Sequence, residues 1–266
     1  MKNNIAVSSM FVSQFISIIS ILFGYVGCGD RTQYLTGGSG SLYPGFGIVT
    51  SNPSNRSPID NGWDKPQAMA LDSTAMYVVG WASRDLQPLW RIEKRGLMDG
   101  ILVTEFGTSG IVSSDIRGAT PFAIALDSTA MYVVGFDNLS PNRQWIIEKR
   151  NLPDGSLVAG FGMSGVVTSN SSEGTDIAYA IAIDSEAIYV AGSDETPGNP
   201  QWRIEKRNLT DGSLVKGFGR GGVVTSNPSG NRDGVMAITL DSTALYIAGY
   251  DESSFDIKWR IEKRIK

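Results

Sequence analysis

The chain has 266 residues, a formal net charge of −4 and no histidine. The acidic balance argues against nucleic acid as a partner, and the missing histidine excludes Ser–His–Asp and Cys–His catalysis and histidine-ligated metal sites. Cys28 is the only cysteine, which excludes a disulfide framework and a cysteine-rich zinc site. We expect no metal site and no cofactor.

Residues 1–28 have the pattern of a targeting segment. Lys2 gives a short positive start, residues 5–27 carry no charge, and Cys28 follows directly. The segment resembles a bacterial lipoprotein signal peptide, although Tyr25 stands where such peptides have an aliphatic residue. This resemblance implies lipidation at Cys28 and attachment to a membrane through the N-terminus, in the cell envelope at the outer membrane or surface. The alternatives are an uncleaved apolar helix, since about 20 apolar residues span a bilayer, and an ordinary signal peptide.

Residues 29–40 are polar and glycine-rich, which indicates a flexible tether. The domain that follows, residues 41–266, is built on a repeated pair of segments. The first segment, such as AIALDSTAMYVVG, occurs at residues 68–80, 123–135, 180–192 and 237–249. The second, WRIEKR or WIIEKR, occurs at residues 90–95, 145–150, 202–207 and 259–264. The repeat recurs every 55 to 57 residues, and a period of this length is typical of propellers and other arrays.

Each repeat predicts four short antiparallel strands. Alternating Ala and Ile or Leu predicts the first strand, and the β-branched and aromatic run after the Asp–Ser–Thr turn predicts the second. The WRIEKR segment predicts the third. A hairpin signal at Asp154 and Gly155 precedes the predicted fourth strand, residues 157–161 in the second repeat. We therefore predict an all-β fold, a four-bladed β-propeller of four-stranded antiparallel blades.

The last repeat stops at its third strand, and the missing piece has a counterpart near the N-terminus. GSLYPGFG at residues 40–47 matches GSLVKGFG at residues 212–219. Residues 41–46 are therefore predicted to supply the fourth strand of the last blade, which would close the ring and remove an exposed strand edge. The alternatives are a truncated or open array and a dimer that forms one larger ring.

The order of motifs also resembles known repeats. FGxxGxV at residues 106–112, 161–167 and 218–224, followed by AIALD, YVVG and NLxDGSL segments, is similar to the bacterial delta-sixty repeat over residues 40–266. WRIEKR departs from that pattern because it is far more charged. The resemblance implies an extracytoplasmic β-propeller without a defined activity. The repeat also resembles quinoprotein-type propeller repeats, but no residues here would carry over their cofactor site.

Three repeated motifs each have a structural and a functional interpretation. The tryptophans could stack on carbohydrate, but their constant place before an apolar residue predicts packing between blades. The Arg-x-Glu-x-Arg segments predict ion pairs on a solvated face rather than a charge array for a ligand. The recurring aspartates predict side-chain bonds within tight turns rather than a ring of metal ligands. These aspartates are Asp72, Asp127, Asp184 and Asp241.

The connections between strands differ in how much they vary among repeats. Those between the second and third strands, and those leading to the next repeat, are variable. In an up-and-down blade both lie on one face, where loops tend to carry function. The candidate ligand-binding residues on this face are Trp63, Trp81, Phe136, Asp137, Asp194, Tyr250 and Asp251. Drift of unconstrained loops is the other explanation.

Aromatic side chains beside carboxylates suit a glycan or a cationic protein surface. We therefore expect a monomeric binding scaffold that engages a protein or a glycan through these loops. A glycan-active hydrolase or lyase is the second hypothesis, with Asp137 and Asp194 as its acidic pair. A structural component of the envelope is the third.

Overall fold

The computed structural model describes residues 42–43, 45–51, 64–84, 87–114, 116, 118–138, 142–253 and 256–266. The signal segment with Cys28, its predicted apolar helix, the tether and Trp63 lie outside these residues. Within the described part the chain forms strands and turns and no helix. The all-β class predicted from the repeat is therefore confirmed.

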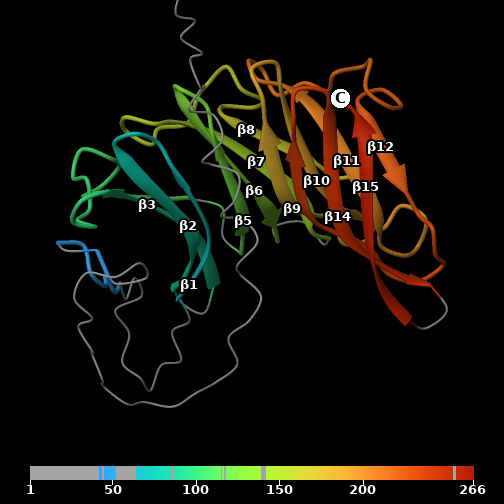
Figure 1. Cartoon of the computed structure of the whole chain (residues 1–266), viewed down its shortest axis with the longest axis horizontal. Helices are drawn as coiled ribbons and strands as arrows, with labels where there is room; N and C mark the ends of the chain where they lie inside the picture. Colours follow the sequence, from blue (N-terminus) through green and yellow to red (C-terminus); the bar gives the residue numbers. More distant parts are fainter. Residues whose placement is uncertain are drawn as a thin grey trace, which may run out of the picture.

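The described strands form four antiparallel sheets, one for each repeat, with the strands of each sheet in chain order (Figure 1). The first sheet contains β1 (Asp64–Leu71), β2 (Ala75–Arg84), β3 (Gln87–Gly96) and β4 (Ile111–Ser113). The second contains β5 (Thr120–Leu126), β6 (Ala130–Asp137), β7 (Gln144–Asn151) and β8 (Val166–Ser169). The third contains β9 (Ile177–Ile183), β10 (Ala187–Asp194), β11 (Gln201–Asn208) and β12 (Val223–Ser226). The last contains β13 (Asp233–Leu240), β14 (Ala244–Ser253) and β15 (Asp256–Ile265).

The sheets follow one another in space in the same order as in the chain. Their first strands lie in contact, β1 with β5, β5 with β9 and β9 with β13. No comparable contact joins β13 to β1 among the described residues. The first and last sheets accordingly lie at opposite ends of the row in Figure 1.

Apolar cores fill the spaces between neighbouring sheets, and each core uses the same repeat positions. Between the second and third sheets, Tyr132 and Trp145 pack with Ile188 and Val190. The indole N–H of Trp145 also donates to the main-chain oxygen of Ser193 on β10, at 3.1 Å. Packing of the repeated tryptophan between sheets is thus confirmed for three copies, Trp90, Trp145 and Trp202.

Each first strand contains a β-bulge opposite the glycine that ends the YVVG-type motif. In the second sheet Pro121 pairs with Gly135 and Ala123 pairs with the preceding residue, so Phe122 is the extra residue. A Cβ on Gly135 would lie 2.0 Å from the main-chain oxygen of Thr120, so no larger residue fits. The bulged residues of the other sheets are Gln67, Tyr179 and Met236.

The repeated aspartates bind the backbone of their own turns. Asp127 Oδ1 accepts hydrogen bonds from the main-chain N–H groups of Thr129 at 2.6 Å and Ala130 at 2.7 Å. Its other oxygen accepts the hydroxyl of Tyr132 at 2.8 Å. The same arrangement recurs at the other aspartates, Asp72, Asp184 and Asp241. The turn interpretation is therefore confirmed.

The predicted fourth strand is wrong. Residues 157–161 contribute a single bridge, between Leu157 and Arg150, and the fourth strand of the second sheet is β8 instead. The reason is that Phe161 is completely buried and inserts into the core, in an edge-to-face contact with Tyr132. The segment therefore packs into the core through Phe161, and strand pairing begins again only at β8, after the glycine-rich turn that follows.

The last sheet also differs from the prediction, because it has three strands among the described residues rather than four. The N-terminal segment 45–51 lies against the first sheet and pairs with no strand. Trp259, the fourth copy of the repeated tryptophan, is 91% exposed, so its predicted burial between blades is wrong. Among the described residues, no strand pairs with the free edge of β15.

In the first three sheets the glutamate of the charged third strand is buried, whereas Glu262 on β15 is half-buried, which corrects the predicted solvated ion pairs. Glu205 is fully buried and accepts hydrogen bonds from Arg203 at 2.8 Å and Arg207 at 2.7 Å. Ser169, from the fourth strand of the preceding sheet, donates to the same carboxylate at 2.8 Å. The neighbouring sheet thus covers the charges, and the pairing offsets the cost of removing them from water.

Candidate functional site

The variable connections meet at one end of the sheets and are tied to each other. In the second sheet, Asn142 of the β6–β7 loop donates to the main-chain oxygen of Ser172 in the β8–β9 loop, at 2.8 Å. In the third, Asn199 of the β10–β11 loop donates to the main-chain oxygen of Asn231, at 2.5 Å. We call this end of the sheets the loop face.

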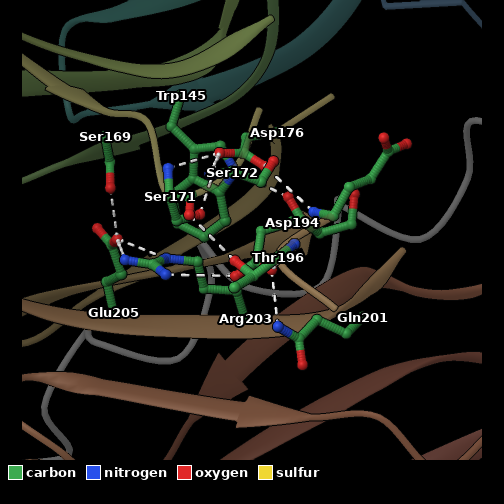
Figure 2. Close-up of polar contacts among 12 residues, drawn as sticks. Trp145, Ser169, Ser171, Ser172, Asp176, Asp194, Thr196, Gln201, Arg203 and Glu205 are labelled. Atoms are coloured by element: carbon green, nitrogen blue, oxygen red, sulfur yellow. Dashed lines mark hydrogen bonds and ion pairs between the residues drawn. The ribbon is translucent and has the colours of Figure 1, made fainter. Parts of the chain in front are cut away.

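A buried carboxylate fixes the loop between β8 and β9. Asp176 is fully buried, and its Oδ2 accepts the main-chain N–H of Ser171 at 2.7 Å and the Ser171 hydroxyl at 3.0 Å. Its Oδ1 accepts the Ser172 hydroxyl at 2.6 Å (Figure 2). Asp233 plays the same part for the next loop, through Ser229. These two loops of the loop face are therefore held by hydrogen bonds to buried carboxylates.

Asp194, at the end of β10, belongs to the same polar network. It is fully buried and accepts hydrogen bonds from Gln201 at 2.7 Å and from the main-chain N–H of Thr196 at 3.0 Å. Its second oxygen lies 3.3 Å from Arg203, which also binds Glu205. Figure 2 shows this chain of contacts running from the loops into the junction between sheets.

The acids predicted for the loop face are already engaged. Asp137 is buried and accepts a hydrogen bond from Gln144 at 2.8 Å, while its other oxygen has no partner in the described part of the chain. Asp251 is half-buried and accepts the hydroxyl of Ser253 at 2.9 Å. Asp137 and Asp194, the pair named for a hydrolase, thus serve the fold of their own sheets. No group of three or more side chains among the described residues is placed to hold a metal ion.

An aromatic cluster lies at the inner edge of the loop face. The ring centroid of Phe122 is 5.1 Å from that of Tyr179 and 5.9 Å from that of Phe136. The exposed guanidinium of Arg143 lies over the Phe136 ring, 4.7 Å from its centroid. Phe122 and Tyr179 are half-buried and Phe136 is buried, so the first two rings give the cluster most of its open surface.

Tyr179 supplies the polar group of this cluster. Burial, and secondly the neighbouring Tyr250, raise the pKa of Tyr179 above its ordinary value of 10.0. Its hydroxyl therefore stays neutral at pH 7 and acts as a hydrogen-bonding group. Planar rings with one neutral hydroxyl and one cation can contact apolar and polar groups of a ligand together.

The structure does not join all of the predicted aromatic residues in one cluster of ring contacts. Phe136 belongs to the cluster, but no ring contact in the described residues joins it to Trp81, which lies half-buried on β2. Tyr250 is half-buried on β14, and its main-chain oxygen accepts the indole N–H of Trp202 at 3.1 Å. Trp63 is not among the described residues.

Phe122 and Tyr179 were missed by the sequence analysis. Both stand one residue before the Ala–Ile–Ala segment, at a position occupied by Gln67 in the first repeat and Met236 in the last. Variation at one position within a constant strand was the available signal. The alternating pattern counted this residue as part of the strand, and only the bulge distinguishes it.

No protein-family model matches this chain, and no curated protein has a significantly similar sequence. Among the described residues, no helix is long and apolar enough to cross a membrane.

Proposed function

We propose that the four sheets are blades of a β-propeller-type repeat scaffold, and that its loop face binds a protein or a glycan. The aromatic cluster of Phe122, Phe136, Tyr179 and Arg143 carries this proposal. Two of its rings, Phe122 and Tyr179, are partly exposed, and the cluster comes from two adjacent sheets and stands where the variable loops meet.

The surroundings of the cluster support a binding role. Buried acids such as Asp176 and Asp194 fix the loops before any ligand arrives, which lowers the entropy lost on binding. Asp137 and Asp194 both accept hydrogen bonds from their own sheets, so a hydrolytic acid pair has no support from the geometry. Sugar rings and apolar side chains both offer flat faces that stack on aromatic rings.

A binding screen against glycans and envelope proteins tests the loop face. We expect a ligand whose affinity falls at least about tenfold in Tyr179→Ala and in Arg143→Ala, because each removes an open contact of the cluster. Met163→Ala is the control, since Met163 is exposed and lies in the connection between β7 and β8. Circular dichroism checks that each variant is folded.

Two results would contradict this assignment. One is a ligand whose affinity is unchanged in both cluster variants. The other is a ligand that Met163→Ala weakens as strongly as the cluster variants do. Cleavage of a glycosidic bond in a screened glycan by the protein would point to an enzyme instead.

We further propose that residues 1–28 hold this scaffold at the cell envelope through a lipid on Cys28, as the signal-like sequence of the segment suggests. In that case the wild-type protein sediments with membranes, and Cys28→Ala moves it to the soluble fraction. Membrane attachment that persists in Cys28→Ala would favour an uncleaved apolar helix.

A further inference from the structure

The two ends of the row of sheets expose complementary surfaces. At one end, Trp259 and Ile261 on β15 are 91% and 73% exposed, and Ile265 is also exposed. We call these residues, with Tyr246 on β14, the last face. Their counterparts in the second sheet, Tyr132, Trp145 and Ile147, are completely buried against the third sheet.

At the other end of the row, the first sheet exposes the residue positions that in the second and third sheets cover the preceding sheet. Met76 and Val78 on β2 occupy the places of Met131 and Val133, which are fully buried against the preceding sheet. In the first sheet both side chains are half-buried. They line a cavity of about 350 Å³ together with Phe46, Val49, Met69 and Arg91. We call this surface the first face.

Residues 45–51 stand against the first sheet in the place of a preceding sheet's fourth strand. Ser51 donates to Glu93 at 3.2 Å, as Ser114 donates to Glu148 at 2.8 Å across the next junction. In that junction Ser114 directly follows β4 of the first sheet, and Glu148 lies on β7 of the second sheet.

A second similarity is the close approach of equivalent side chains to a glycine in the connection between the third and fourth strands of the following sheet. A Cβ on Gly100 would lie 2.5 Å from Val49 and 3.0 Å from Phe46. A Cβ on Gly155 would lie 2.4 Å from Val112 and 2.8 Å from Phe106, which precede the second sheet in the same manner. Residues 45–51 thus occupy the place that a fourth strand takes in front of the second sheet, although they pair with no strand among the described residues.

Among the described residues, the last sheet lacks the fourth strand, and the segment before it, that the other three sheets have. Tyr77, Tyr132 and Tyr189 each contact a phenylalanine from the segment before the fourth strand of their own sheet. Their counterpart Tyr246 has no such ring contact among the described residues. Phe46 is the remaining phenylalanine of the repeated Phe-Gly motif, and it lies at the first face rather than beside Tyr246.

We propose that the last face binds the first face of a second copy of this chain, head to tail. Residues 48–51 of that copy would add to β15 as its fourth strand. The register follows the second sheet, where Trp145 pairs with Ser169 and Ile147 with Val167. In the new junction Trp259 stands opposite Ser51, and Ile261 stands opposite Val49.

The internal junctions also give the contacts of Trp259. Its indole N–H reaches the main-chain oxygen of Trp81 in the second copy, as that of Trp202 reaches Tyr250. Arg91 of the second copy lies over the indole, as Arg260 lies 4.7 Å from the ring centroid of Trp202.

A second copy is the occupant because the first and last faces of one chain lie on sheets that do not meet. β1 and β13 make no contact comparable to those between the other first strands, and the first and last sheets are at opposite ends in Figure 1. A head-to-tail contact generates a closed ring or a filament of copies. This inference is independent of what the loop face binds.

Disulfide trapping tests the junction in the full 266-residue chain. The variant Val49→Cys/Ile261→Cys is made in a Cys28→Ser background, because Cys28 is the only native cysteine. Opposed residues of paired strands lie within reach of a disulfide. We expect oxidation to give chains cross-linked to one another, and each single-cysteine variant to give less than a tenth of that yield. A disulfide within one chain, or none at all, would overturn the proposal.

Sedimentation of variants tests which faces meet. The wild type is expected to form assemblies of two or more copies, and Trp259→Glu to weaken this association at least about 30-fold, as loss of a central tryptophan does. Because Trp259 is exposed in one copy, the variant keeps its circular dichroism spectrum. Met163→Glu, an exposed methionine outside both faces, is the control and keeps the assembly.

Mixing distinguishes head-to-tail from symmetric contact. Trp259→Glu keeps an intact first face, and Met76→Glu/Val78→Glu keeps an intact last face. Neither variant assembles alone, but a mixture of the two is expected to form heterodimers through the one intact pair of faces. A wild type that is monomeric at high concentration, or a Met76→Glu/Val78→Glu variant that still assembles by itself, would refute the proposal.

Discussion

At the residue scale, close approach of backbones explains the most constant glycine of the repeat. Gly80, Gly135, Gly192 and Gly249 each face the bulge of the first strand in their own sheet. At all four the space for a Cβ is taken by a main-chain oxygen between 2.0 and 2.3 Å away. None has a positive φ, so the restriction is steric contact rather than backbone conformation. The same bulge provides Phe122 and Tyr179 to the loop face.

Gly192→Ala is therefore expected to destabilise the protein by about 2 kcal/mol or more, because the Ile177 carbonyl has to move and take the bulge with it. Gly217→Ala is the matched control, since nothing lies within 4 Å of a Cβ there, and its effect should stay within about 0.5 kcal/mol. Urea unfolding of both variants measures the difference. Equal stabilities would show that the bulge adapts without cost.

At the scale of the elements, the repeat unit is a sheet together with its junction to the next sheet. The segment before each fourth strand carries a phenylalanine into the core, and a serine at the end of the fourth strand (Ser169) or directly after it (Ser114) donates to the glutamate of the following sheet. Each junction thus depends on residues from two repeats. This arrangement explains why Trp202 is buried while Trp259, with the same local sequence, is exposed.

At the scale of the whole molecule, hydrogen-bonded acids make the stability of the fold depend on pH in the acidic range but not near neutral pH. Burial alone raises the pKa of Glu93, but hydrogen bonds from Arg91 and Arg95 outweigh it and leave the pKa below 4.5. Burial likewise raises the pKa of Asp127, and hydrogen bonds from Thr129, Tyr132 and Ala130 leave it below 3.8. The chain has no histidine to titrate between pH 5 and 8.

These lowered pKa values fix the sign of the pH dependence. Because the unfolded carboxyls bind protons at higher pH than the folded ones, stability is complete above about pH 4.5, and it is lost as the pH falls through the folded pKa values. We expect a constant free energy of unfolding from pH 8 to 5 and a decline below pH 4.5, measured by urea unfolding across this range. Asp127→Asn should make that decline shallower. A stability loss centred between pH 5.5 and 7 would contradict the assignment.

The amino-acid sequence by itself determined the four repeats, the all-β class, the first three strands of each sheet and the aspartate turns. These depend on local periodicity and turn chemistry, which each repeat carries within its own residues. The predicted fourth strand was misplaced because residues 157–161 have a strand-like composition. Only the tertiary structure shows that Phe161 is buried in the core instead of lying in a strand. Burial of Glu205 and exposure of Trp259 were likewise decided by the neighbouring sheet, which covers one and leaves the other open. The loop-face cluster also required the tertiary structure, since a one-residue bulge brings Phe122 to Tyr179 from the next repeat.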